Sequence, residues 1–328
     1  MFKFWRFTPV ALVLALAVGS FAISYAQESR QKAFKVQLPA DTQALIHLNF
    51  RAMIDSPLAK KMGIEKKSEI IKALDFDVEI LAEMGFDPLK DIDSITIAAP
   101  GGGDMEKCLI ILAGKFKADK LVAKANADAK NNEDNVKIHK AGDKTIFELK
   151  CFFPDQQVPM FMMIASNSTI LASTQKEYLE KAFANSGSKL ANKDFSALVE
   201  KLDPDLAISM VAVSSAFPSK AIPEPYKVII EGIDSIIGIG GIGIDEDVTL
   251  KINVFTKDED SSKKLKETMD QGMAQALGFL GLMAAQEKEL TPVLEFVKSM
   301  KTSSKEKMMS LEGKLPGKMI EDAILGSK

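Results

Sequence analysis

The chain has few of the side chains from which binding and catalytic sites are commonly built. Its 328 residues include one tryptophan, three tyrosines, two histidines and two cysteines. Sugar-binding faces usually stack on exposed indole or phenol rings, so the scarcity of these rings disfavours extended carbohydrate binding. The two histidines, His47 and His139, are too few for a histidine-rich metal site.

Motifs of familiar catalytic chemistry are also missing. The sequence contains no nucleophile elbow, P-loop or H-E-x-x-H pattern. Two acid pairs, Asp75 with Asp77 and Asp91 with Asp93, could perform acid–base chemistry, but nothing in the sequence brings the two pairs together. An enzyme of unknown class is therefore the weaker hypothesis.

One glycine-rich stretch imitates a cofactor motif. Residues 238–243, Gly-Ile-Gly-Gly-Ile-Gly, match the G-x-G-x-x-G dinucleotide pattern, which requires a helix to begin there and hold the pyrophosphate. The residues that follow predict a turn over 245–247 and a strand over 248–254. We therefore expect no cofactor. The glycines instead predict a β-bulge at Gly240-Gly241 and close approach of a helix or a second backbone.

The chain also lacks a strong excess of one charge. Its formal net charge is −3, which does not favour nucleic acid as a partner. With 46% hydrophobic and 27% charged residues, the composition is that of a globular protein large enough for one big core or two smaller ones.

A long uncharged run occurs at the N-terminus. Lys3 and Arg6 precede the uncharged residues 7–26, which end in Ser24-Tyr25-Ala26. This pattern predicts a signal peptide cut after Ala26 and a periplasmic or extracellular protein. The alternative is an uncleaved membrane anchor, although the strongly apolar part, residues 10–23, is shorter than the ~20 residues that a span requires. We expect contact with a membrane, if any, only through an uncleaved leader.

The two cysteines suggest a disulfide in an exported chain. Cys108 alternates in phase with Ile110, and Cys151 alternates in phase with Leu149, so each could point toward a core. Both interpretations stay open: a bridge between Cys108 and Cys151, or two buried thiols that act as small hydrophobic side chains.

An internal repeat indicates the architecture. Ile92-Asp93-Ser94-Ile95 recurs as Ile233-Asp234-Ser235-Ile236, and the next strand repeats a Leu-x-Ile pattern at Leu109 and Leu250. We interpret this as a duplicated strand-strand-helix unit. Short connections favour an α+β fold with largely antiparallel sheets and helices packed on one face. The predicted divisions are a signal peptide (1–26), a flexible lead-in (27–40), a first half (41–202) and a second half (203–328) packed with the first.

Turn and cap residues predict the order of the elements. Hairpins are expected over residues 136–149 and 160–173, and Ser56-Pro57 predicts a helix start. A periodic run over 68–85 predicts another helix. Further helices are expected near residues 118–129, 178–184, 195–202, 261–286, 292–300 and after Pro316, with a strand near 308–315.

The first predicted strand carries the only polar site that we single out. Ala44, Ile46 and Leu48 alternate with Leu45 and His47, which predicts a strand with one apolar face containing Ile46. On the opposite face, His47 and Asn49 form a candidate polar site. The alternative for His47 is a half-exposed sheet residue without function.

The helix over residues 261–286 has an unusual second half. From Gln271 to Gln286 it carries no charge and is rich in glycine and alanine, so we expect it to be covered on most sides by protein. Its start resembles a calcium loop, but Lys263 occupies the glycine position. The acids from Asp258 onward therefore predict a helix N-terminus.

Sixteen methionines include two clusters, residues 160–163 and Met308-Met309. On strands they predict core filling, although methionine also suits a soft surface for apolar ligands.

Two short motifs carry a resemblance to other proteins. They are Gly85-Phe86-Asp87-Pro88 followed by Asp91-Ile92-Asp93-Ser94, and the strand-to-helix start over residues 41–60. In these the chain resembles uncharacterised exported bacterial proteins with a signal peptide and duplicated antiparallel α+β halves. The resemblance implies fold and export. Because those proteins have no known activity, it implies no functional residue.

Three functions follow as hypotheses. The leading one is an exported, non-catalytic binding or scaffold protein whose partner is a protein or an apolar small molecule. The alternative is a periplasmic carrier of an apolar ligand such as a lipid, and the second alternative is an enzyme.

Overall fold

The computed structural model describes residues 38–63, 86–101, 107–131, 136–142, 144–153, 156–184, 189–203, 206–216, 237–287 and 290–325. The predicted leader, most of the lead-in and the predicted helix over residues 68–85 lie outside these ranges, as does the repeat copy at 233–236. The chain forms two compact units. Unit 1 contains residues 52–63 and the described part of Leu198–Lys328, and unit 2 contains residues 38–51 and the described part of Lys66–Ala197.

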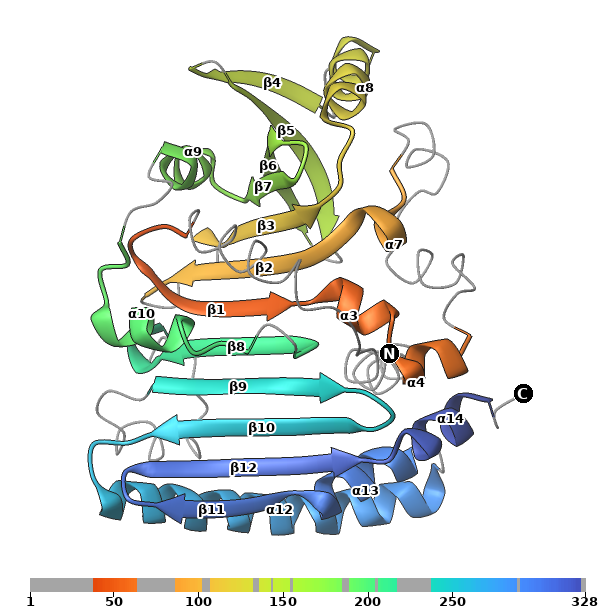
Figure 1. Cartoon of the computed structure of the whole chain (residues 1–328), viewed down its shortest axis with the longest axis vertical. Helices are drawn as coiled ribbons and strands as arrows, with labels where there is room; N and C mark the ends of the chain where they lie inside the picture. Colours follow the sequence, from red (N-terminus) through yellow and green to blue (C-terminus); the bar gives the residue numbers. More distant parts are fainter. Residues whose placement is uncertain are drawn as a thin grey trace. The chain divides into compact units, whose positions relative to one another are not determined.

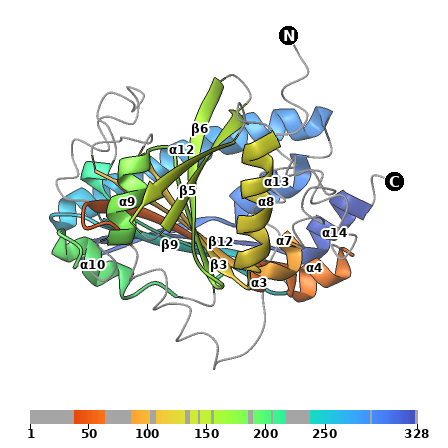
Figure 2. The same ribbon diagram turned by 90° about the horizontal axis from the view of Figure 1, so that it is seen from above.

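Unit 2 is built on an antiparallel sheet in the order β1-β2-β3-β7-β6-β5-β4 (Figure 1). Its strands are β1 (Thr42–Leu48), β2 (Ile92–Pro100), β3 (Leu109–Gly114), β4 (Val136–Ala141), β5 (Lys144–Phe153), β6 (Gln156–Ser166) and β7 (Thr169–Ser173). Its helices are α7 (Pro88–Asp91), α8 (Ala118–Asn131) and α9 (Lys176–Ala184). Figure 2 shows β5 and β6 between α8 and α9.

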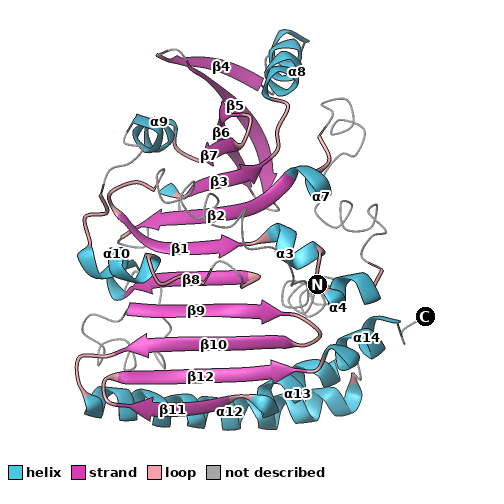
Figure 3. Ribbon diagram, in the orientation of Figure 1, coloured by secondary structure: helices cyan, strands magenta, loops and turns pink. Residues whose placement is uncertain are grey.

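Unit 1 has a second antiparallel run of strands in the order β11-β12-β10-β9-β8 (Figure 3). Its strands are β8 (Ile208–Val213), β9 (Ile237–Ile244), β10 (Val248–Phe255), β11 (Lys301–Lys305) and β12 (Met308–Leu315). Its helices are α4 (Pro57–Lys61), α12 (Glu259–Gln286), α13 (Thr291–Ser299) and α14 (Gly317–Leu325). Two further helices, α3 (Phe50–Ile54) and α10 (Lys193–Val199), span the points where the chain passes from one unit to the other.

The two faces of the sheet in unit 1 differ sharply, as alternation along antiparallel strands predicts. The four helices cover one face, on which Leu58, Leu265, Phe296 and Ile320 pack against strand residues such as Ile244. On the other face the side chains pair with each other across the strands. Lys251 forms a 2.7 Å ion pair with Glu312, and Ser310 donates a 2.8 Å hydrogen bond to Asn253. The predicted antiparallel α+β class is confirmed.

The glycine-rich strand β9 corrects one prediction. Its register with both neighbours runs without a shift from Ile237 to Ile244, so the expected β-bulge at Gly240-Gly241 is wrong. Close approach is present: a Cβ at Gly241 would lie 2.2 Å from Cδ1 of Leu206 and 3.0 Å from the backbone oxygen of Ile208. The glycines make room for side chains from the adjacent segment, and no helix begins where a dinucleotide would require one.

The first strand corrects a second prediction. Leu45 and His47 are buried on β1, whereas Ile46, which we expected on the core face, is 42% exposed. The neighbouring strand shows the same preference, because Thr96, opposite His47, is buried and Ile97, opposite Ile46, is half-buried. The alternation of apolar residues predicted the strand correctly, but the face that contains Leu45 and His47, and not the face that contains Ile46, is the more deeply buried one.

Local signals were more reliable. Both hairpins are present, with Gly142 in the turn of the first and residues 167–168 in the turn of the second, and the strand over Met308–Leu315 is confirmed. Ser56 caps α4, accepting a 2.7 Å hydrogen bond from the Ala59 N–H, and Pro57 is the first helical residue. Strand β11, with the polar sequence Lys-Thr-Ser-Ser-Lys, was not predicted.

A strand-strand-helix succession occurs twice, as β2-β3-α8 and as β9-β10-α12. Its origin by duplication stays a prediction, because the second copy of the Ile-Asp-Ser-Ile motif lies outside the described residues.

Candidate functional site

The long helix α12 has two halves with different surroundings. Its first half begins at Asp258, whose carboxylate accepts a 2.7 Å hydrogen bond from the Ser261 N–H, as an N-cap does. Leu265 then packs against Met309 and Leu311 of β12. This half is therefore fixed to the sheet by apolar contacts.

Polar contacts reinforce this attachment along β11. The hydroxyls of Ser262 and Ser304 lie 2.7 Å apart, and Thr302 donates a short hydrogen bond to Asp270. Lys266 donates to the same carboxylate at 2.6 Å. These two hydrogen bonds lower the pKa of Asp270 below its usual value of 3.8. We call the contacts of Ser262 with Ser304 and of Asp270 with Thr302 the β11 latch.

The second half extends beyond what the sheet can cover. A helix of 28 residues is about 42 Å long, whereas the 8 residues of β10 span about 27 Å. Figure 1 shows α12 running along β11 and β12 and continuing past them toward α13. The latch ends at Asp270, and the uncharged residues begin directly after it.

We call residues 271–286 the uncharged segment. All of them are described, and none is buried. Phe279 is 59% exposed and Leu282 is 72% exposed. A Cβ added at Gly278 or Gly281 would meet nothing within 4 Å. The expectation that protein covers this segment on most sides is wrong, because the helix outruns the sheet on which its first half packs.

The candidate polar site at His47 includes a buried contact within the sheet. Nδ1 of His47 lies 2.8 Å from Oγ1 of Thr96, and burial lowers the pKa of His47 to about 4. Asn49 follows the strand and is half-buried. His47 is 8% exposed, so the alternative of a half-exposed histidine is wrong, whereas a functional role for His47 and Asn49 stays a prediction.

The structure brings together a histidine–carboxylate pair that the sequence did not reveal. His139 on β4 lies with Nε2 2.7 Å from Oε2 of Glu148 on β5, and this hydrogen bond lowers the pKa of Glu148. Lys137 approaches the same carboxylate at 3.5 Å. The register of the hairpin places Lys137 opposite Glu148, and His139 is two residues further along the same face of β4. Knowledge of this register would have predicted the contact between His139 and Glu148. The contact joins side chains of neighbouring strands on the β4–β5 hairpin.

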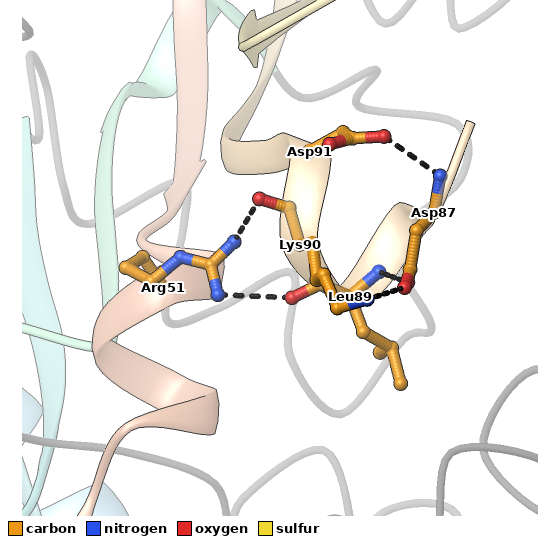
Figure 4. Close-up of polar contacts among 5 residues, drawn as sticks. All are labelled: Arg51, Asp87, Leu89, Lys90 and Asp91. Atoms are coloured by element: carbon orange, nitrogen blue, oxygen red, sulfur yellow. Dashed lines mark hydrogen bonds and ion pairs between the residues drawn. The ribbon is translucent and has the colours of Figure 1, made fainter. Parts of the chain in front are cut away.

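The motif that carried the family resemblance is explained by a local contact (Figure 4). Asp87 caps the short helix α7, and Asp91 accepts a 2.7 Å hydrogen bond from the Asp87 N–H. Arg51 donates to the backbone oxygens of Leu89 and Lys90 at 2.9 and 2.7 Å. The arginine satisfies carbonyls that the end of the helix leaves without partners.

The acid pair Asp91 and Asp93 belongs to the same arrangement. Asp93 lies 3.7 Å from Nε of Arg51, so both acids of this pair contact residues that hold the turn. Asp75 and Asp77 lie outside the described residues.

The cysteines and methionines give a mixed outcome. Cys108 is half-buried directly before β3, and the side chain of Cys151 lies outside the described residues, so the disulfide stays a prediction. Met163 is 0% exposed and Met309 is 2% exposed. For these two methionines the interpretation as core filling is confirmed.

Comparisons with known proteins identify no family. No protein-family model matches the chain, and no curated protein is similar to it. A solved structure, "Structure of crystal form I of TP0453", is similar over 89% of this chain and 96% of its own, with 7% sequence identity and a TM-score of 0.44. A likeness this distant transfers no site or ligand.

The described residues were also considered as metal ligands and as membrane-spanning helices. No group of three or more histidine, cysteine or acidic side chains there is placed to hold a metal ion. In the same part of the chain, no helix combines the length and apolarity needed to cross a membrane.

Proposed function

We propose that this protein is an exported, non-catalytic binding or scaffold protein, and that the uncharged segment of α12 is its binding surface. One observation carries the proposal. Phe279 and Leu282 keep 59% and 72% of their surface exposed on a helix stretch that has no charged side chain. Single apolar side chains on a surface need no explanation, but a contiguous apolar surface marks an interaction site.

The energetics favour a partner for this surface. Covering an exposed phenylalanine or leucine contributes about 1–3 kcal/mol each, and no charge in the segment has to be desolvated on contact. The polar clusters elsewhere in the described residues serve the fold, as Arg51 does for α7 and Asp270 does for α12. The non-catalytic part of the proposal rests on these structural roles.

Export rests on the leader pattern and has its own test. N-terminal sequencing of the exported protein is expected to begin at Gln27. An intact Met1 on a membrane-bound product would contradict the predicted cleavage.

The binding surface is tested with a solvatochromic dye such as Nile red. The wild-type protein is expected to bind the dye with enhanced, blue-shifted emission, and Phe279→Gln with Leu282→Gln is expected to remove most of that signal. The matched control is Ile138→Gln, which changes an apolar side chain that is 39% exposed on β4. A signal equal in all three proteins would refute α12 as the binding surface.

A second candidate, the carrier of an apolar ligand, has one observation in its favour. Ile46, Ile97 and Ile110 lie directly opposite one another across β1, β2 and β3, and none of the three is fully buried. This row could contact an acyl chain. Mass spectrometry of organic extracts from natively purified protein tests it: a stoichiometric lipid would favour the carrier over the scaffold, and no co-purifying molecule would reject it.

A further inference from the structure

The uncharged segment narrows the choice of partner by its size. Its 16 residues, 271–286, form a rod about 24 Å long and about 10 Å wide, which presents a footprint of roughly 240 Å². A stable protein–protein interface buries about 800 Å² on each side. Since this projected area is small, we expect a second copy or another folded protein to need contacts beyond this segment for a stable interface.

The composition of the segment points to a partner without specific polar groups. Its exposed face consists of Gln271, Gly272, Ala274, Gln275, Gly278, Phe279, Leu282, Ala285 and Gln286. This face offers apolar surface with a few amides and no charge for an ion pair. A lipid surface requires neither shape complementarity nor charge pairing, and the strength of binding to it increases with the apolar area that a helix buries there.

Charges delimit the segment at both ends. Before it, the exposed residues of α12 include Lys263, Lys264 and Glu267, and after it comes the exposed Glu287. At about 24 Å the segment is also shorter than the ~30 Å hydrocarbon core of a bilayer. This arrangement suits a helix that lies in the plane of the interface, with its charged ends in water.

We propose that residues 271–286 of α12 dock in the interfacial plane of a lipid bilayer, with Phe279 and Leu282 inserted among the acyl chains. This inference rests on the proposed function and names the partner of the same surface. It differs from the expectation based on the leader, which allowed membrane contact only through residues 1–26. Because the flanking charges are of both signs, binding is expected to zwitterionic lipid and to depend weakly on salt.

The chain offers a local probe for this contact. Trp5 is the only tryptophan, so the full chain with Trp5→Phe and Phe279→Trp carries one fluorophore, placed in the segment. With phosphatidylcholine vesicles we expect a blue shift of its emission and quenching by lipid brominated on the acyl chains. Adding Leu282→Gln is expected to weaken partitioning about tenfold.

The matched control carries Trp5→Phe and Ile138→Trp, which puts the fluorophore at an exposed position on β4. Its emission is expected to stay unchanged when vesicles are added. If the protein binds vesicles through its leader alone, position 279 will show no shift, and the inference is overturned. A shift that grows with protein concentration without lipid would indicate a second copy and would also overturn it.

The dye experiment distinguishes failure of the proposed bilayer partner from failure of the proposed binding surface. Dye binding that depends on Phe279 and Leu282, without any vesicle effect at position 279, would leave the binding surface standing and reject the bilayer. Loss of both results would reject the proposed function as well.

Discussion

His47 illustrates how a polar side chain can belong to the interior of a sheet. It is buried on β1 beside the buried Thr96 of β2, and the 2.8 Å contact between Nδ1 and the hydroxyl satisfies one ring nitrogen. Burial penalises the charged imidazolium, which is why the pKa falls from 6.5 to about 4. The neutral ring is the form that the fold stabilises.

This shift predicts a pH dependence of stability. The unfolded chain takes up a proton at His47 below about pH 6.5, whereas the folded chain does so only below about pH 4. The stabilisation is therefore complete above the unfolded pKa and is lost as the pH falls between the two values, by up to roughly 3 kcal/mol. Urea unfolding between pH 7 and pH 4 is expected to show a flatter profile for His47→Gln than for wild type, with His139→Gln as the control. Parallel profiles for wild type and His47→Gln would contradict the assignment.

The glycines of β9 lead to a second prediction, which concerns the stability of alanine variants. A Cβ at Gly241 would lie 2.2 Å from Leu206 Cδ1 and 3.0 Å from the Ile208 backbone oxygen. Gly241→Ala is therefore expected to cost about 1–3 kcal/mol. At Gly238 the nearest neighbour would be 3.9 Å away, which makes Gly238→Ala the matched control in the same strand. Thermal melting compares them, and equal midpoints would show that Leu206 moves aside freely.

At the scale of the element, α12 joins an anchored half to an exposed half. The anchored half depends on the β11 latch and on Leu265, while the exposed half has only partial contacts. Since the pKa of Asp270 is lowered from 3.8, its charged form holds the latch above that value, and the contribution disappears as the pH falls through the lowered pKa.

The β11 latch predicts that removing the Ser262 hydroxyl destabilises the protein more than removing the hydroxyl of Ser303, which lies outside the latch. Ser262→Ala removes a buried hydroxyl that contacts Ser304, and is expected to cost about 1 kcal/mol, or about 2–4 °C in melting temperature. Ser303→Ala, on the opposite side of β11 and exposed, is the control. Hydrogen exchange is expected to lose protection in the first half of α12 only. Equal exchange in both variants would argue against the latch.

At the scale of the whole molecule, one unit is built from two parts of the chain that are far apart in sequence. Residues 52–63 precede most of unit 2 in sequence but belong to unit 1. Leu58 is 0% exposed there and packs with Ile244, Leu315 and Ile320, and its N–H donates to the Asp245 oxygen at 3.3 Å. Nothing in the sequence repeat indicated this arrangement.

Separating the C-terminal part of unit 1 from the rest of the chain should therefore damage the unit. Residues 198–328 expressed alone lack Leu58 and are expected to aggregate, whereas the same residues joined to residues 52–63 by a glycine–serine linker are expected to melt more cooperatively. In the full chain, Leu58→Ala is expected to cost about 2–5 kcal/mol, and the exposed Lys60→Ala much less. Identical melting of the fragment with and without the segment would contradict this account.

Local structure was largely predictable from the sequence, because caps and turns act between neighbouring residues. Ser56-Pro57 started α4, Asp258 capped α12, and β4 paired with β5 as the expected hairpin. Strand β11 was not predicted, because its five residues contain no apolar side chain. Its place beside β12 and α12 follows from long-range contacts. The contact between His139 and Glu148 was not predicted, because the sequence indicated a hairpin but not which side chains lie opposite each other in it.

By itself the sequence determined the class of the fold and the order of most elements. It also determined that residues 271–286 form a helix without charge. The tertiary structure alone decided that His47 is buried while Ile46 is 42% exposed, that Leu58 joins unit 1, and that the uncharged segment faces water. The physical reason is that helix and strand propensity depend on neighbours in sequence, whereas burial depends on what lies opposite in space. A helix of about 42 Å on strands of about 27 Å extends beyond the sheet, so one face of its end stays exposed to water.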